Sequence, residues 1–375
     1  MRTLILSCNT GEGHNSCAKA IKDVFDERNL PCDMEDSLRF ISPGVSRMIC
    51  KGHIFIYRNI PILFTKGYTG AEKHSGVFRE GKPIARFLCR GTDALAKFIR
   101  SNGYDHVICV HPFAGIAMRD VLRHHPMNIR LSIVATDYTC NPGTEQCPAD
   151  WFFSPDPTLQ DRFTDQGISP SRIIASGIPV RQTFYDRENR ETAKLACCIA
   201  PGHKHLLVMS GSMGCGPIRE LMDLLVAHIP PNVEISVLAS SNSSLKQTLE
   251  QKYNQNPHVH IYGFHHNISQ LMDSADLFVT KPGGLSVSEA ATKGLPMVLI
   301  DAVAGCEAHN LRFFCDLGGA VAAKEPKELD RLCQQLLQDD EKRAYMAAQL
   351  APFAQRNAAN IIFETHCQPQ PNLGA

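Results

Sequence analysis

Three polar side chains in the first half of the chain stand where acid–base chemistry could take place. His14 lies in the segment NTGEGHNSCAKAI, His111 follows the apolar run HVICV, and Asp137 follows the run RLSIVAT. Each of them is expected just after a strand, at the edge of a sheet where ligands bind. An imidazole or a carboxylate at that edge can remove a proton from a hydroxyl group. On local pattern alone, His14 could equally be an exposed histidine in a strand-to-helix turn, and Asp137 an N-cap or turn residue.

Two glycine-rich segments in the second half of the chain could bind phosphate. They are VMSGSMGCGPIREL at 208–221 and TKPGGLSVSEAATKG at 280–294. Each joins an apolar run to a helical pattern, and the amides and dipole of a helix N-terminus attract anions. Neither is a Walker loop, because no Gly-Lys-Ser/Thr follows. Two such openings in one sheet suit a diphosphate, although Ser286 and Glu289 also have the spacing of a capping box.

The elements that must position these residues are short apolar runs alternating with helical patterns. This alternation predicts buried parallel strands with helices on both faces of each sheet. The runs lie at 3–8, 106–110, 130–136, 172–176, 205–210, 233–240, 258–262, 276–280 and 296–300. Ligands of such sheets bind at the carboxyl ends of the strands, which is where the polar residues occur.

The domain organisation follows from a charged stretch between two sets of runs. We expect an α/β protein with two doubly wound, Rossmann-like domains facing a central cleft. The expected parts are a first domain at 1–182, a linker at 183–200, a second domain at 201–340, and a C-terminal helix and tail at 341–375.

The composition indicates a cytosolic protein and gives no sign of a metal site. The 375 residues include 38 basic and 38 acidic ones, so the whole chain has no bias toward a polyanion. The 15 cysteines form no Cys-x-x-Cys pair, which is typical of reduced thiols. No apolar run is long enough to span a membrane, and the amino terminus does not have the pattern of a signal peptide. The 16 histidines lack the spacing of a ligand set.

A local excess of positive charge lies at residues 39–100. This segment has twelve Lys or Arg residues, among them Lys51, Arg58 and Lys66, against three acidic residues, a net charge of +9. Apolar and aromatic residues are interleaved, as in MICKGHIFIYRNIPILFTKGY. This mixture favours adsorption to an anionic membrane surface. A solvated face is the plain alternative, and no nucleic-acid-binding motif accompanies the charge.

Taken together, these residues resemble a known family of enzymes. The segments NTGEGHNSCAKAI, GIPV and above all TKPGGLSVSEAATKGLPMVLIDAVAGCEAHN are similar to the monogalactosyldiacylglycerol synthase and processive diacylglycerol glucosyltransferase group of glycosyltransferase family 28. The resemblance runs in order from residue 3 to about 325. It implies a GT-B fold and inverting transfer of a hexose, from UDP-glucose or UDP-galactose, to the hydroxyl of diacylglycerol.

The resemblance also implies roles for individual residues, and the transfer that it implies needs no obligatory metal. His14 would be the base that deprotonates the acceptor, with Asp137 a second candidate. Gly13, His111, Lys51, Arg58 and Lys66 would serve the acceptor or the membrane. The residues implied in donor binding are Gly211, Ser212, Gly214, Gly263, Phe264, Pro282, Gly283, Gly284, Leu285, Ser286, Glu289, Cys306, Glu307 and Asn310. Among these, Glu289 would hold the ribose, and the backbone near Phe264 would receive uracil. Cys306 stands where the family usually has glutamine, so the hexose stays open.

Three other functions share part of this pattern. One is N-acetylglucosaminyl transfer to a polyprenyl diphosphate lipid in wall synthesis. Another is a nucleotide-sugar-binding protein without catalysis, and a third is a soluble epimerase of UDP-sugars. The basic segment argues against the epimerase, and the intact His14 and Glu289 argue against a purely binding role. We expect a cytoplasmic enzyme at the inner face of the cell membrane.

Overall fold

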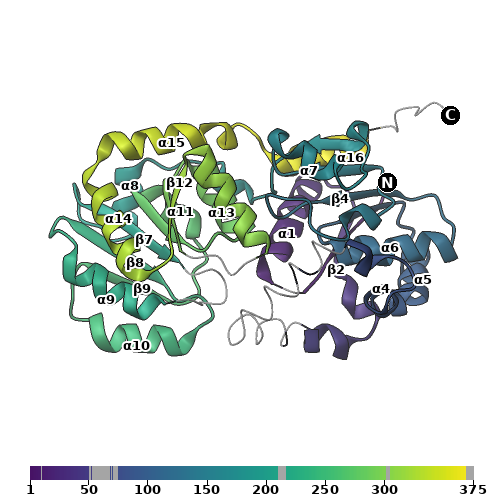
Figure 1. The fold of residues 1–375 in the computed structure, drawn as a ribbon, viewed down its shortest axis with the longest axis horizontal. Coiled ribbons are helices and arrows are strands. Elements are labelled where there is room, and N and C mark those ends of the chain that lie inside the picture. The colour runs from purple at the N-terminus through teal and green to yellow at the C-terminus, as the bar shows by residue number, and fades with distance from the viewer. Residues whose placement is uncertain are drawn as a thin grey trace. The chain divides into compact units, whose positions relative to one another are not determined.

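Two compact units make up the chain. The computed structural model describes residues 1–9, 11–49, 52, 68, 70, 75–209, 217–300 and 305–368. Unit 1 comprises Met1–Arg181 and Arg356–Ala375, and unit 2 comprises Gln182–Gln355 (Figure 1). The predicted α/β class is confirmed, because each unit contains a six-stranded, entirely parallel sheet among its described residues.

The sheet of unit 1 has the strand order β2-β1-β3-β4-β5-β6. Its strands are β1 (Thr3–Ser7), β2 (Cys32–Asp36), β3 (His106–Cys109), β4 (Arg130–Val134), β5 (Trp151–Ser154) and β6 (Ile173–Ala175). Its helices are α1 (Glu12–Glu27), α4 (Pro83–Leu88), α5 (Thr92–Asn102), α6 (Pro112–His124), α7 (Gln160–Thr164) and α16 (Ala358–Cys367). Short 3₁₀ turns connect them at Ser37–Phe40, Ser75–Phe78, Cys89–Gly91, Thr144–Gln146, Pro157–Leu159 and Pro170–Arg172.

The sheet of unit 2 has the order β12-β11-β10-β7-β8-β9. Its strands are β7 (Lys204–Met209), β8 (Val233–Leu238), β9 (Val259–Tyr262), β10 (Leu277–Thr280), β11 (Met297–Ile300) and β12 (Ala320–Ala323). Its helices are α8 (Arg190–Ala196), α9 (Ile218–His228), α10 (Ser243–Tyr253), α11 (Ile268–Ser274), α12 (Gly284–Lys293), α13 (Cys306–Leu317), α14 (Pro326–Gln338) and α15 (Asp340–Ala354), with a 3₁₀ turn at Gln182–Phe184.

Each strand order has one point at which the direction of winding reverses. In unit 1 the reversal lies between β1 and β3, and in unit 2 between β10 and β7. Successive loops leave such a point toward opposite faces of the sheet, which opens a crevice at the carboxyl ends of the two strands. Among the residues that the structure describes, the loops after β1, β3 and β10 are therefore places at which the topology favours ligand binding.

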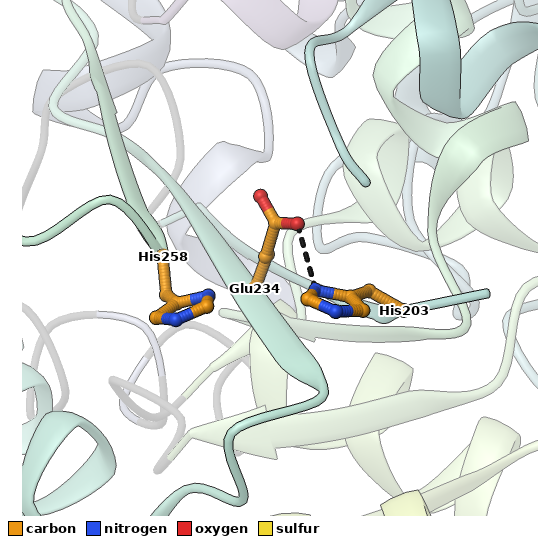
Figure 2. Close-up of side chains that lie close together, drawn as sticks. All are labelled: His203, Glu234 and His258. Atoms are coloured by element: carbon orange, nitrogen blue, oxygen red, sulfur yellow. Dashed lines mark hydrogen bonds and ion pairs between the residues drawn. The ribbon is translucent and has the colours of Figure 1, made fainter. Parts of the chain in front are cut away.

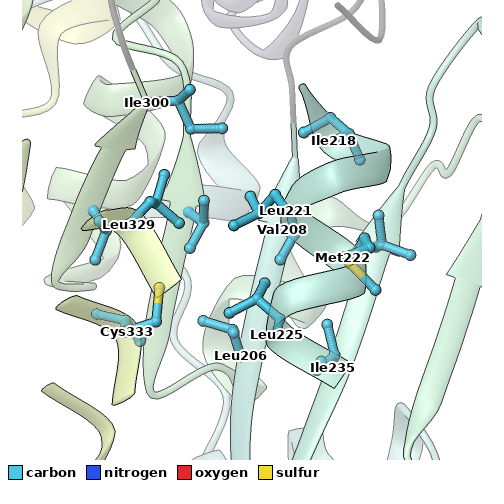
Figure 3. Close-up of a cluster of buried hydrophobic side chains, with 14 of the residues drawn as sticks. Leu206, Val208, Ile218, Leu221, Met222, Leu225, Ile235, Ile300, Leu329 and Cys333 are labelled. Carbon is cyan, nitrogen blue, oxygen red and sulfur yellow. The ribbon is translucent and has the colours of Figure 1, made fainter. Parts of the chain in front are cut away.

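The core of unit 2 explains why its apolar runs are continuous. Leu206 and Val208 of β7 are fully buried under α9, whose Leu221 and Leu225 face the sheet four residues apart (Figure 3). A parallel strand covered by helices on both faces has no solvent-facing positions, so its sequence does not alternate. The nine predicted runs are confirmed as strands, and β2, β5 and β12 are the strands that the runs did not include.

The segment expected to link the domains packs within unit 2. Lys194 of α8 and Asp276, which precedes β10, form an ion pair at 3.2 Å with both side chains at most 8% exposed. The hydroxyl of Ser269 in α11 donates to the carbonyl of Thr183. At the other end of the chain, α15 packs on α12 in unit 2, whereas α16 returns to unit 1 and packs on α1.

Candidate functional site

His14 lies in the first turn of the helix that follows the first strand of unit 1. Strand β1 ends at Ser7 and helix α1 begins at Glu12, with Gly11 as its N-cap in extended backbone conformation. No side-chain hydrogen bond caps this helix. Gly13 and His14 are both half-buried. The predicted strand–turn–helix setting of the histidine is thus present at the reversal point of the sheet.

The hydrogen bonds of His14 define its protonation pattern. Its Nδ1 lies 3.2 Å from the carbonyl oxygen of Val110 and 3.0 Å from Oγ1 of Thr136. A carbonyl oxygen can only accept, so Nδ1 carries the proton and donates it. In the neutral ring Nε2 is then the unprotonated nitrogen, which is the form that a general base requires.

The surroundings of His14 also favour the neutral ring. Burial lowers the pKa of His14 below the usual 6.5, while the charge of Asp137 and the bond to Val110 oppose this shift without cancelling it. Burial disfavours the charged imidazolium because it removes water from around the charge. The lowered pKa therefore favours the uncharged ring of His14 at neutral pH, with its single proton on Nδ1.

His111 lies beside His14 and has the complementary tautomer. The two rings meet edge to face with their centroids 4.6 Å apart. His111 is the N-cap of α6, and its Nδ1 accepts a hydrogen bond from the backbone N–H of Phe113 at 3.0 Å. Since Nδ1 accepts, Nε2 carries the proton in the neutral ring. One ring can thus accept a proton while its neighbour can donate a hydrogen bond.

Asp137 belongs to the same group of side chains. It is 8% exposed and follows β4, and its charge acts on His14. Its Oδ2 accepts from the amide of Asn141 at 3.1 Å, and Oδ1 of Asn141 accepts from the hydroxyl of Tyr68 at 2.7 Å. Our sequence prediction did not include Asn141 and Tyr68. The turn residues Asn-Pro-Gly, which begin seven residues after the end of β4 at Val134, were the available signal for Asn141.

The glycine pair of unit 2 opens helix α12 directly after β10. Gly283 is the N-cap with φ −70° and ψ 132°, the helix begins at Gly284, and no side chain caps it. A capping box at Ser286 and Glu289 is therefore wrong, because the helix starts before Ser286 and places this residue in its first turn. Pro282 precedes the N-cap, and Leu285 and Ser286 lie in the first turn of the helix. The first-turn amides and the helix dipole favour an anion here.

Two side chains predicted to bind the donor lie inside unit 2 near this opening. Glu289 is 7% exposed within α12. Asn310 of α13 is fully buried, and its side-chain amide donates to the carbonyl of Pro282 at 2.9 Å. Asn310 thereby ties α13 to the loop before α12. Cys306 and Glu307, at the start of α13, are half-buried.

Gly263 and Phe264 follow β9 at the carboxyl edge of the same sheet. Phe264 is 73% exposed, a large aromatic side chain on the surface. A Cβ on Gly263 would lie 3.3 Å from the side chain of Lys246, so the backbone approaches α10 closely there. Strands β7 and β8 separate β9 from β10, so the two loops lie three strand spacings apart, roughly 14 Å.

Six of the predicted residues fall outside the part of the chain that the structure describes. They are Gly211, Ser212 and Gly214 of the first glycine-rich segment, and Lys51, Arg58 and Lys66 of the basic segment. The described end of the basic segment has exposed cationic side chains at Arg79, Lys82, Arg86, Arg90, Lys97 and Arg100. In the described portion of the chain, no helix combines the length and the apolarity that crossing a bilayer requires.

Comparison with known sequences places both units in one family. The sequence model of monogalactosyldiacylglycerol (MGDG) synthase matches residues 14–180, and that of the glycosyltransferase family 28 C-terminal domain matches residues 205–362. The chain belongs to glycosyltransferase family 28. The predicted family is confirmed, and with it the prediction that the protein is a glycosyltransferase.

A relative and two crystal structures add detail. The processive diacylglycerol beta-glucosyltransferase of Bacillus cereus (strain G9842) is 27% identical over 383 residues, which covers 98% of this chain and 95% of the relative. MurG from Acinetobacter baumannii has a TM-score of 0.66 at 17% identity, with 97% of this chain and 98% of MurG covered. UDP-GlcNAc 2-epimerase from Neisseria meningitidis has a TM-score of 0.63 at 13% identity, with 97% and 99% covered. The likeness to MurG and the other glycosyltransferases confirms the GT-B fold.

Proposed function

We propose that this protein transfers a hexose from a UDP-sugar to the hydroxyl of diacylglycerol, with inversion at the anomeric carbon. The full-length similarity to a processive diacylglycerol beta-glucosyltransferase supports the reaction class and the lipid acceptor. The observation that carries the mechanism is the neutral His14, whose Nδ1–H is engaged by Val110 so that Nε2 is left as a base. The donor is UDP-glucose or UDP-galactose.

The acceptor is activated in unit 1. Nε2 of His14 takes the proton of the acceptor hydroxyl, while the oxygen forms a bond to the anomeric carbon. The bond between that carbon and the diphosphate oxygen breaks, and UDP leaves from the opposite face of the sugar. The Thr136 hydroxyl and the Val110 carbonyl hold the ring that becomes an imidazolium. Asp137 stabilises that positive charge electrostatically.

The donor is held in unit 2. The uncapped amides at the start of α12 bind the diphosphate, and their dipole stabilises the negative charge that develops on it as the bond breaks. Glu289 accepts hydrogen bonds from the ribose hydroxyls, and uracil binds beside Gly263 and Phe264. This arrangement needs no obligatory metal ion, because the helix N-terminus supplies the positive potential.

The protein contacts the membrane through the basic segment of unit 1, residues 39–100. Arg86 is exposed on the short helix α4, next to Ile84, which is 46% exposed. Exposed cations attract anionic headgroups, and an exposed aliphatic side chain enters the acyl boundary. This pairing supports a peripheral position on an anionic membrane surface, and we place the protein at the cytoplasmic face.

A transfer assay tests this function. Purified protein is incubated with dioleoylglycerol in anionic vesicles and with UDP-glucose or UDP-galactose in parallel, each with and without EDTA. We expect a glycolipid from one of the two donors, at a rate that EDTA does not abolish. The absence of product with both donors, from a protein that binds UDP, would contradict the proposal.

A further inference from the structure

A cluster of histidines surrounds one buried carboxylate at the amino edge of the sheet in unit 2. Glu234 is the second residue of β8 and its side chain is 4% exposed. His203 precedes β7, and His258 precedes β9, so three neighbouring strands bring these residues together. One potential ligand atom from each of the three lies within 4.8 Å of the other two.

The strand register explains why these side chains converge. Ile235 pairs with Val259 in the parallel ladder between β8 and β9, so Glu234 and His258 stand side by side one residue earlier. His260 lies two residues after His258 and therefore on the same face of the strand. Figure 2 shows the carboxylate of Glu234 between the rings of His203 and His258.

The carboxylate is held in a fixed orientation by its other contacts. Nδ1 of His203 lies 2.9 Å from Oε1, and the backbone N–H of Ala200 donates to the same oxygen at 2.8 Å. Nε2 of His260 lies 2.7 Å from Oε2. The contacts from Ala200 and His260 come from outside the group of His203, Glu234 and His258, and hydrogen bonds of this kind orient a ligand carboxylate in metal sites.

The cluster contains more imidazoles than the buried charge needs. A buried carboxylate must be paired or hydrogen-bonded, and Ala200, His203 and His260 already satisfy that requirement for Glu234. The ring of His258 has no hydrogen-bond partner among the residues that the structure describes, and yet it stands within reach of the same carboxylate. Pairing of the buried carboxylate therefore does not explain the position of His258 in the cluster.

We propose that His203, Glu234 and His258 bind a divalent transition-metal ion of the Zn²⁺ type. Two imidazoles and one carboxylate form a ligand set that zinc accepts in a tetrahedral site, with water in the fourth position. Ligand atoms at zinc distances stand about 3.4 Å apart in a tetrahedron. The present separations of at most 4.8 Å therefore have to shorten when the ion binds, and the half-exposed ring of His258 is not fixed by burial. His203 is 27% exposed, which gives the ion access from solvent.

The site is separate from the proposed chemistry. It lies at the amino ends of β7, β8 and β9, whereas α12 begins at the carboxyl edge of the same sheet. Metal binding would tie the starts of three strands together and stabilise the folded unit, since an ion that binds only the native state raises its stability. Hexose transfer would not depend on it.

A zinc titration of the full chain tests the site. Isothermal titration calorimetry with Zn²⁺ is compared between the wild type, the double variant His203→Gln/His258→Gln and the control His228→Gln. His228 also meets a buried carboxylate, Asp330, at 2.9 Å, but no third ligand joins that pair among the described residues. We expect one Zn²⁺ per wild-type or control chain, and an affinity reduced more than about 10-fold in the double variant.

Two further measurements separate a metal site from a structural cluster. Zn²⁺ should raise the melting temperature of the wild type and of His228→Gln by several degrees, and Mg²⁺ should not, because imidazole ligands do not suit magnesium. The single variant His258→Gln should fold like the wild type and still lose zinc affinity. Equal zinc affinity in the wild type and the His258→Gln variant, or no zinc binding by the wild type, would overturn the proposal.

Discussion

The two units contain the same kind of parallel sheet, but the candidate functional groups at the two sheets differ in kind. At the reversal point of unit 1, the candidate groups are side chains: His14 and His111 stand 4.6 Å apart with opposite tautomers. At the reversal point of unit 2, the candidate groups are backbone amides, because α12 starts after Gly283 without a side-chain cap. The histidine cluster of unit 2 lies at the other edge of its sheet. One architecture can thus present either a base or an anion site, according to the residues that follow its strands.

The largest effect is expected when the imidazole of His14 in unit 1 is removed. In His14→Ala the transfer rate should fall by about 10²–10⁴, the usual contribution of a general base. The dissociation constant of the UDP-sugar should stay unchanged, because the donor is assigned to unit 2. Steady-state kinetics and calorimetry on the same sample check both. His125→Ala, which removes a surface histidine paired with Asp93, is the control and should keep full activity. A loss of donor affinity in His14→Ala that parallels the loss of transfer rate would refute the assignment of the base to unit 1 and of the donor to unit 2.

The next largest effect is expected in unit 2, at Glu289. Glu289→Gln removes the charge that is assigned to the ribose hydroxyls, and hydrogen bonds to charged groups are worth about 1.5–3 kcal/mol. UDP should therefore bind about 10–100-fold more weakly, as measured by calorimetry. Glu328→Gln changes an exposed glutamate of α14 and should bind UDP like the wild type. Unaltered UDP binding by Glu289→Gln would remove this residue from the donor site.

A third prediction concerns the stability of unit 1. His366 of α16 is fully buried, its Nδ1 lies 2.7 Å from Oγ of Ser132, and burial lowers its pKa to about 3. His106 and Arg130 lower the pKa further, and Asp105 opposes them. The unfolded chain takes up a proton below pH 6.5 and the folded chain does not. The group therefore reduces stability as the pH falls from 6.5 toward 3, by about 2 kcal/mol at pH 5.

Urea unfolding at pH 7.5 and pH 5 measures this effect. His366→Gln should lose about 2 kcal/mol less than the wild type between the two values. The same acid destabilisation in both proteins would show that α16 contributes no neutral buried histidine to unit 1.

The smallest effect is expected at Phe264. Its ring is 73% exposed, so Phe264→Ala should leave the melting temperature unchanged. If uracil stacks on it, the KM for the donor should rise about 5-fold, the low end for a base on an aromatic ring. Donor kinetics identical to those of the wild type would place the base elsewhere on the carboxyl edge of unit 2.

The architecture could be predicted from the sequence because buried parallel strands are continuous apolar runs. The strands that the runs missed have physical reasons. Strand β2 (CDMED) carries three acidic residues and β12 (AVAA) three alanines, and both are edge strands. Strand β5 (WFFS) lies inside the sheet, and prolines at 148 and 155 stand close to it on both sides.

The candidate sites were predicted less completely, since their geometry depends on residues far apart in the sequence. The tautomer of His14 is set by Val110, 96 residues away. The start of α12 at Gly284, not at Ser286, could not be read from a local capping pattern. The cluster at Glu234 was not predicted because its potential ligands lie at the starts of three strands that are far apart in the sequence, whereas ligand spacing in a sequence detects sites within one helix or loop.

The central claim is that a neutral His14 accepts the proton of the lipid hydroxyl, and the pH dependence of kcat/KM tests it most directly. This parameter reports the ionisation of the free enzyme. Because burial lowers the pKa of His14, activity should rise with pH along a limb whose midpoint lies below 6.5, and the residual activity of His14→Ala should lack that limb. A limb with its midpoint above 6.5, or the same limb in both proteins, would contradict the account.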